Sequence, residues 1–252
     1  MSAEVHRDEF VKLVNIGNEY KCIKYINKYN DFYDTKYCDL DLETDIANIL
    51  IYVCKNKLSR VAIALIDKKC NLTYQDNYGY TALMMASLHE LHDVVTHIIN
   101  NSQDTTTRCL NYGNQFSEMI YLCYRSYNNN INIIKMIDRG YDIYYKVNNS
   151  SLFTAALQRE STNIVEKLMD KDINFADEFK TYCKFNGIEP NFYNTIVKYI
   201  NGKHDTYKHT IIATMDDASP ANALYQSFHT TYAVGLVDII CDFIVLRMGN
   251  IL

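Results

Sequence analysis

Paired apolar residues recur along this chain at intervals of about 33 residues. The blocks that share this pattern are, in chain order, Ile23 with Ile26, Val61-Ala62 with Leu65-Ile66, Val94-Val95 with Ile98-Ile99, Ile133-Ile134 with Met136-Ile137, Ile164-Val165 with Leu168-Met169, and Ile196-Val197 with Ile200. Residues three or four apart lie on one face of an α-helix, so each block predicts a helix with one apolar face. About five or six copies predict a repeat array, in which each unit buries its apolar face against its neighbours.

The segment from Asp76 to Ala86 indicates how one of these units begins. Gly79 can adopt the positive φ of a tight turn, and the side chain of Asp76 can bond to the backbone of that turn. Thr81 is placed to cap the following helix, because its hydroxyl can accept from a free backbone N–H of the first turn. Leu83 and Ala86 share one face of that helix, where the small Ala lets a neighbouring helix come close. The segment resembles the opening of an ankyrin repeat, whose usual pattern is D-x-x-G-x-T-P-L-H-x-A-A.

Two further pieces of the chain carry the same resemblance. The turn at residues 77–79 (NYG) recurs at residues 111–113, and residues 152–156 (LFTAA) resemble the L-x-x-A-A of a later repeat. The departures are Ala82 where Pro is usual and Met84 where His is usual. The pattern is therefore similar to that of a diverged ankyrin-repeat protein.

The resemblance implies an all-α ankyrin-repeat solenoid of about five to six helix-pair repeats with a helical C-terminal cap. It covers residues 43–177 well, residues 5–42 and 178–203 loosely, and the rest of the chain not at all. The expected divisions are an N-terminal capping helix pair and insertion (1–42), ankyrin-like repeats (43–203) and a C-terminal helical tail or cap (204–252).

Hairpin-like turns separate the helices that we expect. The predicted pairs lie near 8–15 and 20–28, 45–55 and 58–68, 81–89 and 92–100, 116–127 and 131–139, 151–158 and 162–170, and 178–185 and 190–201. Residues 29–42 form a polar and aromatic insertion, and residues 101–110 are expected to be an exposed loop. After Gly202 we expect a polar segment, 203–219, and then one or two helices between 221 and 247.

Composition argues against several classes of function. Of the 252 residues 48% are hydrophobic, so the chain can bury a substantial core. Its net charge is −5 and it has no basic block, which argues against a nucleic-acid surface. The start lacks the apolar stretch of a signal peptide, and the longest apolar run, from Ala233 to Leu246, is shorter than the roughly 20 residues of a membrane span. We therefore expect a soluble intracellular protein with no nucleic-acid or membrane partner.

The residues Asn, Ile, Lys and Tyr are abundant, and AT-rich codons encode all of them. In this respect the chain is similar to the diverged ankyrin-repeat proteins of large DNA viruses, namely the giant viruses of amoebae and the poxviruses. The resemblance implies a viral protein that acts in the host cytoplasm.

The histidines at 89, 92 and 97 suggest a metal site, but their spacing argues against one. A zinc-binding helix of the H-E-x-x-H type needs two histidines four residues apart, whereas His89 and His92 are three apart and fall at an expected turn. The eight cysteines form no C-x-x-C pair and are expected to be small buried hydrophobes. No phosphate-binding glycine loop or nucleophile elbow is present in the sequence. We expect no metal, no cofactor, no catalytic residue and no enzyme activity.

Ankyrin-repeat proteins bind partners through their loop tips and the exposed side of each first helix, and the resemblance assigns both surfaces here. The residues at these positions are Tyr74, Asn77, Tyr78, Tyr80, Leu88, His89, Asn111, Tyr112, Tyr144 and Tyr145. Tyrosine offers a large contact area at little cost in entropy, which suits protein recognition. AT-rich codons alone explain any single one of these tyrosines equally well.

The tail contains an apolar helix whose members occupy most of its circumference. We expect this helix to be covered on two sides, with Val237, Ile240 and Ile244 as candidates for self-association in a homodimer. The favoured function is a non-enzymatic protein–protein interaction module, a viral protein that binds a host or viral protein through its concave face. The alternatives are a virion or assembly component that self-associates through this helix, and a ubiquitin-ligase adaptor, although the tail lacks an F-box-like pattern.

Overall fold

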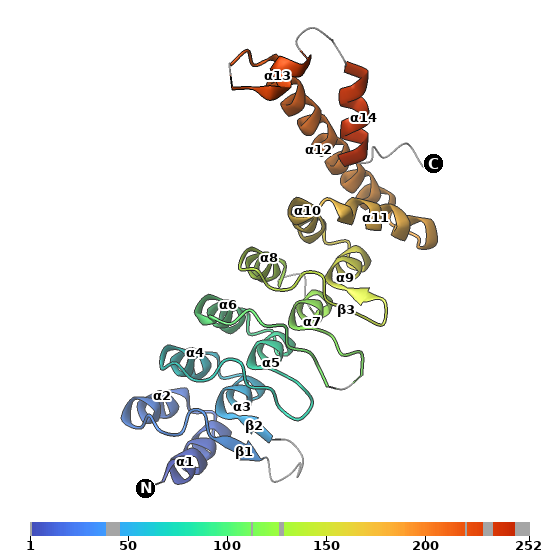
Figure 1. Ribbon diagram of the computed structural model, residues 1–252. Coiled ribbons are helices and arrows are strands. Elements are labelled where there is room, and N and C mark those ends of the chain that lie inside the picture. Colours follow the sequence, from blue (N-terminus) through green and yellow to red (C-terminus); the bar gives the residue numbers. More distant parts are fainter. Residues whose placement is uncertain are drawn as a thin grey trace. The chain divides into compact units, whose positions relative to one another are not determined.

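Helix pairs make up the first of the two units into which the chain divides, Met1–Ala155 and Ala156–Leu252 (Figure 1). The computed structural model describes residues 2–38, 46–111, 113–125, 129–219, 221–228 and 234–244. The helices of the first unit are α1 (Ala3–Asn15), α2 (Glu19–Lys28), α3 (Ile49–Lys55), α4 (Ser59–Asp67), α5 (Ala82–Leu88), α6 (His92–Asn101), α7 (Glu118–Arg125) and α8 (Asn130–Asp138). The unit boundary falls within α9 (Leu152–Gln158).

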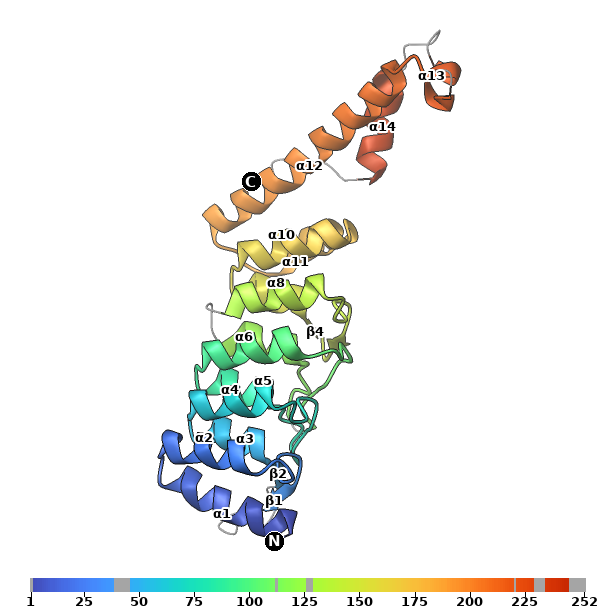
Figure 2. The same ribbon diagram turned by 90° about the vertical axis from the view of Figure 1, so that its left-hand side faces the viewer.

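The helices of the first unit lie in two rows. In one row α1 packs on α3, α3 on α5 and α5 on α7, and in the other α2 packs on α4, α4 on α6 and α6 on α8. Figure 1 shows the two rows nearly end-on, and Figure 2 shows the second helices of the pairs in front. This arrangement confirms the expected all-α architecture of stacked helix pairs.

Short polar residues begin the first helix of each pair. Asn48, Thr81, Ser117 and Ser151 stand just before α3, α5, α7 and α9, at intervals of about 33–36 residues. The side-chain oxygen of each accepts the backbone N–H three residues further on, at 2.9, 3.3, 3.4 and 3.1 Å. Each bond satisfies an N–H that the helix itself leaves without a partner, so the cap fixes where the helix starts. The cap expected at Thr81 is confirmed.

Most residues of the apolar blocks are buried, and Ile23, Ile134 and Val197 are half-buried. The residues that we expect to form the core of the repeats are each at most 3% exposed: Leu50, Leu65, Leu83, Ala86, Val95, Ile98, Ile137, Ala155, Val165 and Leu168. The spacing of the apolar blocks therefore identified the packed faces of the helices correctly.

The described part of the expected insertion, residues 29–38, contributes to the core. Phe32 is fully buried and its ring lies 4.9 Å from that of Phe10, while the hydroxyl of Tyr33 donates to the carbonyl of Ile26 at 2.7 Å. Strand β1 (Lys36–Cys38) then pairs antiparallel with β2 (Ile46–Asn48). Because β2 takes up residues 46–48, the helix expected from residue 45 begins only at Ile49. A second antiparallel pair joins β3 (Lys146–Val147) to β4 (Ser150–Ser151).

The second unit contains the rest of α9 and the helices α10 (Thr162–Lys171), α11 (Asn174–Phe185), α12 (Pro190–Asp216), α13 (Ala223–Phe228) and α14 (Val234–Ile244). In it α10 packs on both α11 and α12, and α12 also packs on α13 and α14. The rings of Phe179 and Tyr193 stack at 5.8 Å between α11 and α12. The hydroxyl of Tyr199 donates to Asp170 at 2.5 Å between α10 and α12.

Helix α12 is longer than predicted. We expected it to end near residue 201 and to be followed by a polar segment, but it continues through Gly202 to Asp216. A single Gly costs a helix only about 1 kcal/mol, and α12 begins well, with Pro190 in its first turn and the carboxylate of Glu189 accepting from the N–H of Phe192 at 2.7 Å. The prediction that this helix ends near residue 201 was therefore wrong.

Candidate protein-binding surface

The loop before α5 is a tight turn built around Asp76. Its carboxylate accepts the backbone N–H groups of Tyr78 at 2.9 Å and Tyr80 at 2.8 Å, and it is only 6% exposed. Gly79 has a φ of +85°, which favours glycine. A Cβ at this glycine would also lie 2.6 Å from the backbone N of Asn111, so no side chain fits there. The turn thus holds Tyr78 at its outer end.

Backbone bonds join this loop to the next one. The N–H of Asn111 donates to the carbonyl of Tyr78 at 2.8 Å. The side-chain amide of Gln75 donates both to Gly79 and to Cys109, at 2.9 Å each, and so connects the same two loops. One backbone bond and the side chain of Gln75 therefore hold the two loops to one another.

The structure separates the predicted binding residues into three groups. The exposed ones are Asn77, Tyr78, Asn111 and Tyr144. The half-buried ones are Tyr74, Tyr80, Leu88, His89 and Tyr145. Tyr112 lies outside the described residues.

Two of the half-buried tyrosines stabilise the loops themselves. The ring of Tyr80 meets that of Tyr121 edge to face at 5.8 Å. The hydroxyl of Tyr145 donates to the carbonyl of Gln115 in the preceding loop at 3.1 Å. The most exposed aromatic side chains of the predicted set are Tyr78 and Tyr144, which are 43% and 56% exposed.

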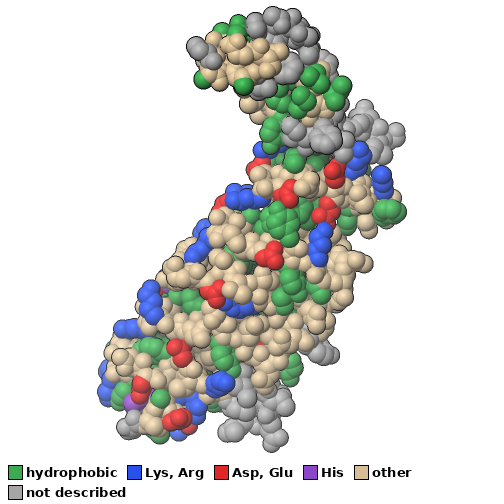
Figure 3. Space-filling view, in the orientation of Figure 1, with side chains coloured by type: hydrophobic (Ala, Val, Ile, Leu, Met, Phe, Trp, Pro, Cys, Tyr) green, Lys and Arg blue, Asp and Glu red, His purple; other side chains and the backbone are tan. Residues whose placement is uncertain are grey.

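The ends of the first helices add residues that sequence reasoning missed. Leu88 and His89 were predicted at the end of α5, and the corresponding places on neighbouring helices hold Lys55 at the end of α3 and Tyr124 and Arg125 at the end of α7. All are half-buried or exposed. Counting seven or eight residues from each helix cap finds them in the sequence, once the caps are known. In Figure 3 the hydrophobic side chains of the first unit form separate patches among polar and charged ones.

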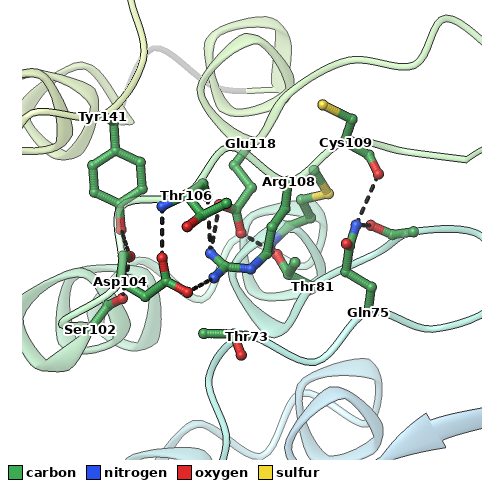
Figure 4. A network of polar contacts seen from close by, with 12 residues as sticks. Thr73, Gln75, Thr81, Ser102, Asp104, Thr106, Arg108, Cys109, Glu118 and Tyr141 are labelled. Carbon is green, nitrogen blue, oxygen red and sulfur yellow. Dashed lines mark hydrogen bonds and ion pairs between the residues drawn. The ribbon is translucent and has the colours of Figure 1, made fainter.

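A buried carboxylate holds the loop between α6 and α7, and nothing in the sequence indicated it. Glu118, in the first turn of α7, is 5% exposed. One of its oxygens accepts from the hydroxyl of Thr81 at 2.7 Å, and the other lies 3.8 Å from the guanidinium of Arg108 (Figure 4). Arg108 also pairs with Asp104 and donates to the carbonyl of Thr106 at 3.2 Å. The loop expected at 101–110 is thus partly buried and fixed by charge.

Burial dominates the ionisation of this group. It raises the pKa of Glu118 to about 7, against the opposing effects of the Thr81 hydrogen bond and the positive charge of Arg108. The carboxyl group therefore changes charge near neutral pH.

Comparison with known families bears on the first unit. The family model "Ankyrin repeats (3 copies)" matches residues 11–109. The matched part of the first unit has the fold of an ankyrin-repeat solenoid. No curated protein matches the sequence.

Burial makes two cysteine thiols of the first unit poor nucleophiles. Burial raises the pKa of the Cys22 thiol to about 11 and that of the Cys70 thiol to about 12, which disfavours the nucleophilic thiolate. Of the three histidines whose spacing argued against a metal site, His97 has its Nε2 2.7 Å from the carboxylate of Asp67. No cluster of three His, Cys, Asp or Glu side chains with ligand geometry occurs among the described residues.

The ankyrin repeats are followed by the candidate self-association helix, α14. Val237 is 2% exposed and Cys241 is fully buried on the helix that packs against α12. Ile240 is 38% exposed, Ile239 is 65% exposed, and the side chain of Ile244 lies outside the described residues. Val237 therefore belongs to the interior of the second unit, not to a free surface. Within the described part of the chain, none of the helices is both long and apolar enough to cross a membrane.

Proposed function

We propose that this chain is a non-enzymatic protein–protein interaction module, part of a viral protein that binds a host or viral protein in the host cytoplasm. The repeats that we assign to binding are residues 43–203, between an N-terminal capping pair and a C-terminal tail. The supporting observation is the row of loop tips that display Tyr78 and Tyr144 on loops bonded to their neighbours. The viral origin is supported by the abundance of Asn, Ile, Lys and Tyr.

Exposed tyrosines on a fixed backbone suit recognition for a physical reason. Binding energy concentrates in a few aromatic and Arg side chains, and ordering a loose loop on binding would consume part of it. Here the backbone bond from Asn111 to Tyr78 has ordered the loop already. A partner would then gain most of the contact energy of each tyrosine.

Site-specific photocrosslinking tests this proposal. A benzoylphenylalanine side chain replaces Tyr78 in the full chain, and in a control protein it replaces Ile131, which is 69% exposed on a second helix, α8. We expect the Tyr78 probe to capture one protein from extracts of cells that express the chain, and the Ile131 probe to capture none. The captured protein is then purified and titrated calorimetrically against the wild type.

The titration decides the outcome. Tyr78→Ala and Tyr144→Ala should each weaken binding about tenfold, as truncation of an aromatic anchor costs about 1–2 kcal/mol. Ile131→Ala should leave the affinity unchanged. Equal capture from both positions, or no loss of affinity in either tyrosine variant, would show that the loop tips are not the binding surface.

One observation favours the alternative of self-association through the tail. Ile239 and Ile240 expose apolar side chains on α14. Multi-angle light scattering of the full chain tests this, with Ile240→Asp as the variant that should shift a dimer to monomer. A monomer at all concentrations would exclude it.

A further inference from the structure

Basic side chains lie in the last turns of α1, α3 and α7, although the whole chain is negative. We use the name first-helix surface for the side chains near the C-terminal ends of α1, α3, α5 and α7: Lys12, Asn15, Lys55, His89, Tyr124 and Arg125. The last four residues of each of these helices include no Asp or Glu. The one acidic side chain of α3, α5 and α7 is Glu118, which is buried. A net charge of −5 therefore coexists with first-helix ends that lack Asp and Glu, although the exposed Glu90 follows His89 in the turn after α5.

Contacts show that these helix ends adjoin one another. The hydroxyl of Tyr52 on α3 donates to the side chain of Asn15 on α1 at 2.5 Å. At the end of α5, burial lowers the pKa of His89, and the positive charges of Lys57 and Lys55 lower it further. The basic side chains of neighbouring repeats are thus near enough to act on each other.

Aromatic rings lie beside the charge at the end of α7. The guanidinium of Arg125 lies 5.0 Å from the centre of the Tyr121 ring, and the Tyr124 ring stacks on Phe116 at 5.1 Å. A guanidinium has five N–H donors, so one that lies over a ring can also bind a carboxylate, with two parallel bonds. This end of the surface therefore offers both a carboxylate site and apolar contact area.

We propose that the first-helix surface binds an extended acidic peptide segment of the partner, with carboxylates opposite Lys12, Lys55 and Arg125. Charge complementarity selects the acidic class. The spacing selects the extended form, because packed helices lie about 8–10 Å apart and three residues of extended chain span about 10 Å. An acid at every third position would then meet one repeat after another. This inference rests on the proposed function.

Synthetic peptides of defined sequence test the binding of acidic segments before the partner is known. Fluorescein-labelled (Glu-Leu-Ser)₄ is titrated with the full chain by fluorescence anisotropy, alongside (Gln-Leu-Ser)₄ and a peptide of the same composition with its four glutamates contiguous. We expect the first peptide to bind about tenfold more tightly than the glutamine peptide and about threefold more tightly than the contiguous one, and to weaken as salt rises.

Matched variants assign the binding to the first-helix surface. The triple change Lys12→Gln, Lys55→Gln and Arg125→Gln should lower the affinity for the glutamate peptide about tenfold. The control removes three positive charges from the second helices and their ends: Lys24→Gln, Lys68→Gln and Lys135→Gln. It should change affinity less than twofold, and circular dichroism checks that both variants remain folded.

Several results would overturn the inference. They are equal binding of the glutamate and glutamine peptides, equal loss in the two triple variants, and no binding of the glutamate peptide at any concentration. Capture by the Tyr78 probe is independent of these charges. If that capture succeeds while the peptide result is negative, the interaction module stands and only its acidic ligand is wrong.

Discussion

Replacing Glu118 with Gln tests how far burial raises the pKa of this carboxyl group, which holds the loop between α6 and α7. The pKa of this carboxyl group is about 7 in the folded chain and close to 4.5 when unfolded. At about 1.4 kcal/mol for each pKa unit, a shift of roughly 2.5 units corresponds to about 3 kcal/mol of stability that depends on pH.

The sign of this pH dependence follows from the number of protons that the folded and the unfolded chain bind at Glu118. Between pH 4.5 and 7 the folded chain keeps the proton on Glu118, whereas the unfolded chain has released it. Stability from this group is therefore complete below pH 4.5 and is lost as the pH rises through 7. From pH 5 to pH 8 the loss amounts to about 2–3 kcal/mol. A glutamine, which does not titrate, still accepts the hydroxyl bond from Thr81 and should show no such loss.

Urea denaturation followed by circular dichroism at pH 5 and pH 8 gives the measurement. The wild-type free energy of unfolding minus that of Glu118→Gln should fall by about 2–3 kcal/mol between the two values, because the other titrating groups cancel in the difference. Glu90→Gln, at an exposed turn residue, serves as the control and should keep the wild-type slope. A difference that does not change with pH, or that rises, would show that the charge of Arg108 outweighs burial and that Glu118 is ionised throughout.

Three further predictions concern stability, each measured by urea denaturation. Leu83→Ala should cost about 2–5 kcal/mol, because Leu83 is 2% exposed in the packed row of first helices, and a cost below 1 kcal/mol would contradict this packing. Gly79→Ala should lower the free energy of unfolding more than Gly113→Ala. Both glycines have a positive φ, which costs another residue about 1–2 kcal/mol, but of the two only Gly79 has backbone atoms where a Cβ would lie. Equal losses of stability would refute the close approach of the Asn111 backbone to Gly79. Glu90→Gly should stabilise the chain by about 0.5–1 kcal/mol, since Glu90 has a φ of +60°, and destabilisation would show that this conformation carries no strain.

The repeating part of the fold was predictable from the sequence because the same spacing of apolar residues recurs in several repeats. The apolar blocks around Val95 and Leu168 identified buried faces, and Thr81 identified a helix start. The same reasoning failed where a signal occurs once. Gly202 was taken as the end of a helix, yet packing by α14 and the helix-compatible residues beyond it carry α12 to Asp216.

The exposure and the contacts of the proposed binding surface were predictable only in part. Tyr78 and Tyr144 follow from their place in the loops, and both are exposed. The partnership of Glu118 with Arg108 and Thr81 was not predictable, because it joins a helix start to an irregular loop and to the cap of the preceding repeat. No local pattern encodes such a contact, since its members are brought together only by the stacking of two repeats.

The bond from the Asn111 amide to the Tyr78 carbonyl gives neighbouring loops a common motion. One tip cannot swing outward without breaking a hydrogen bond to the next, so opening of either loop exposes amides in two repeats at once. The rate at which these amides exchange with solvent then reports on a pair of repeats, not on a single turn. A ligand seated on one tip would slow exchange at its neighbour without touching it, because the loops share one opening event.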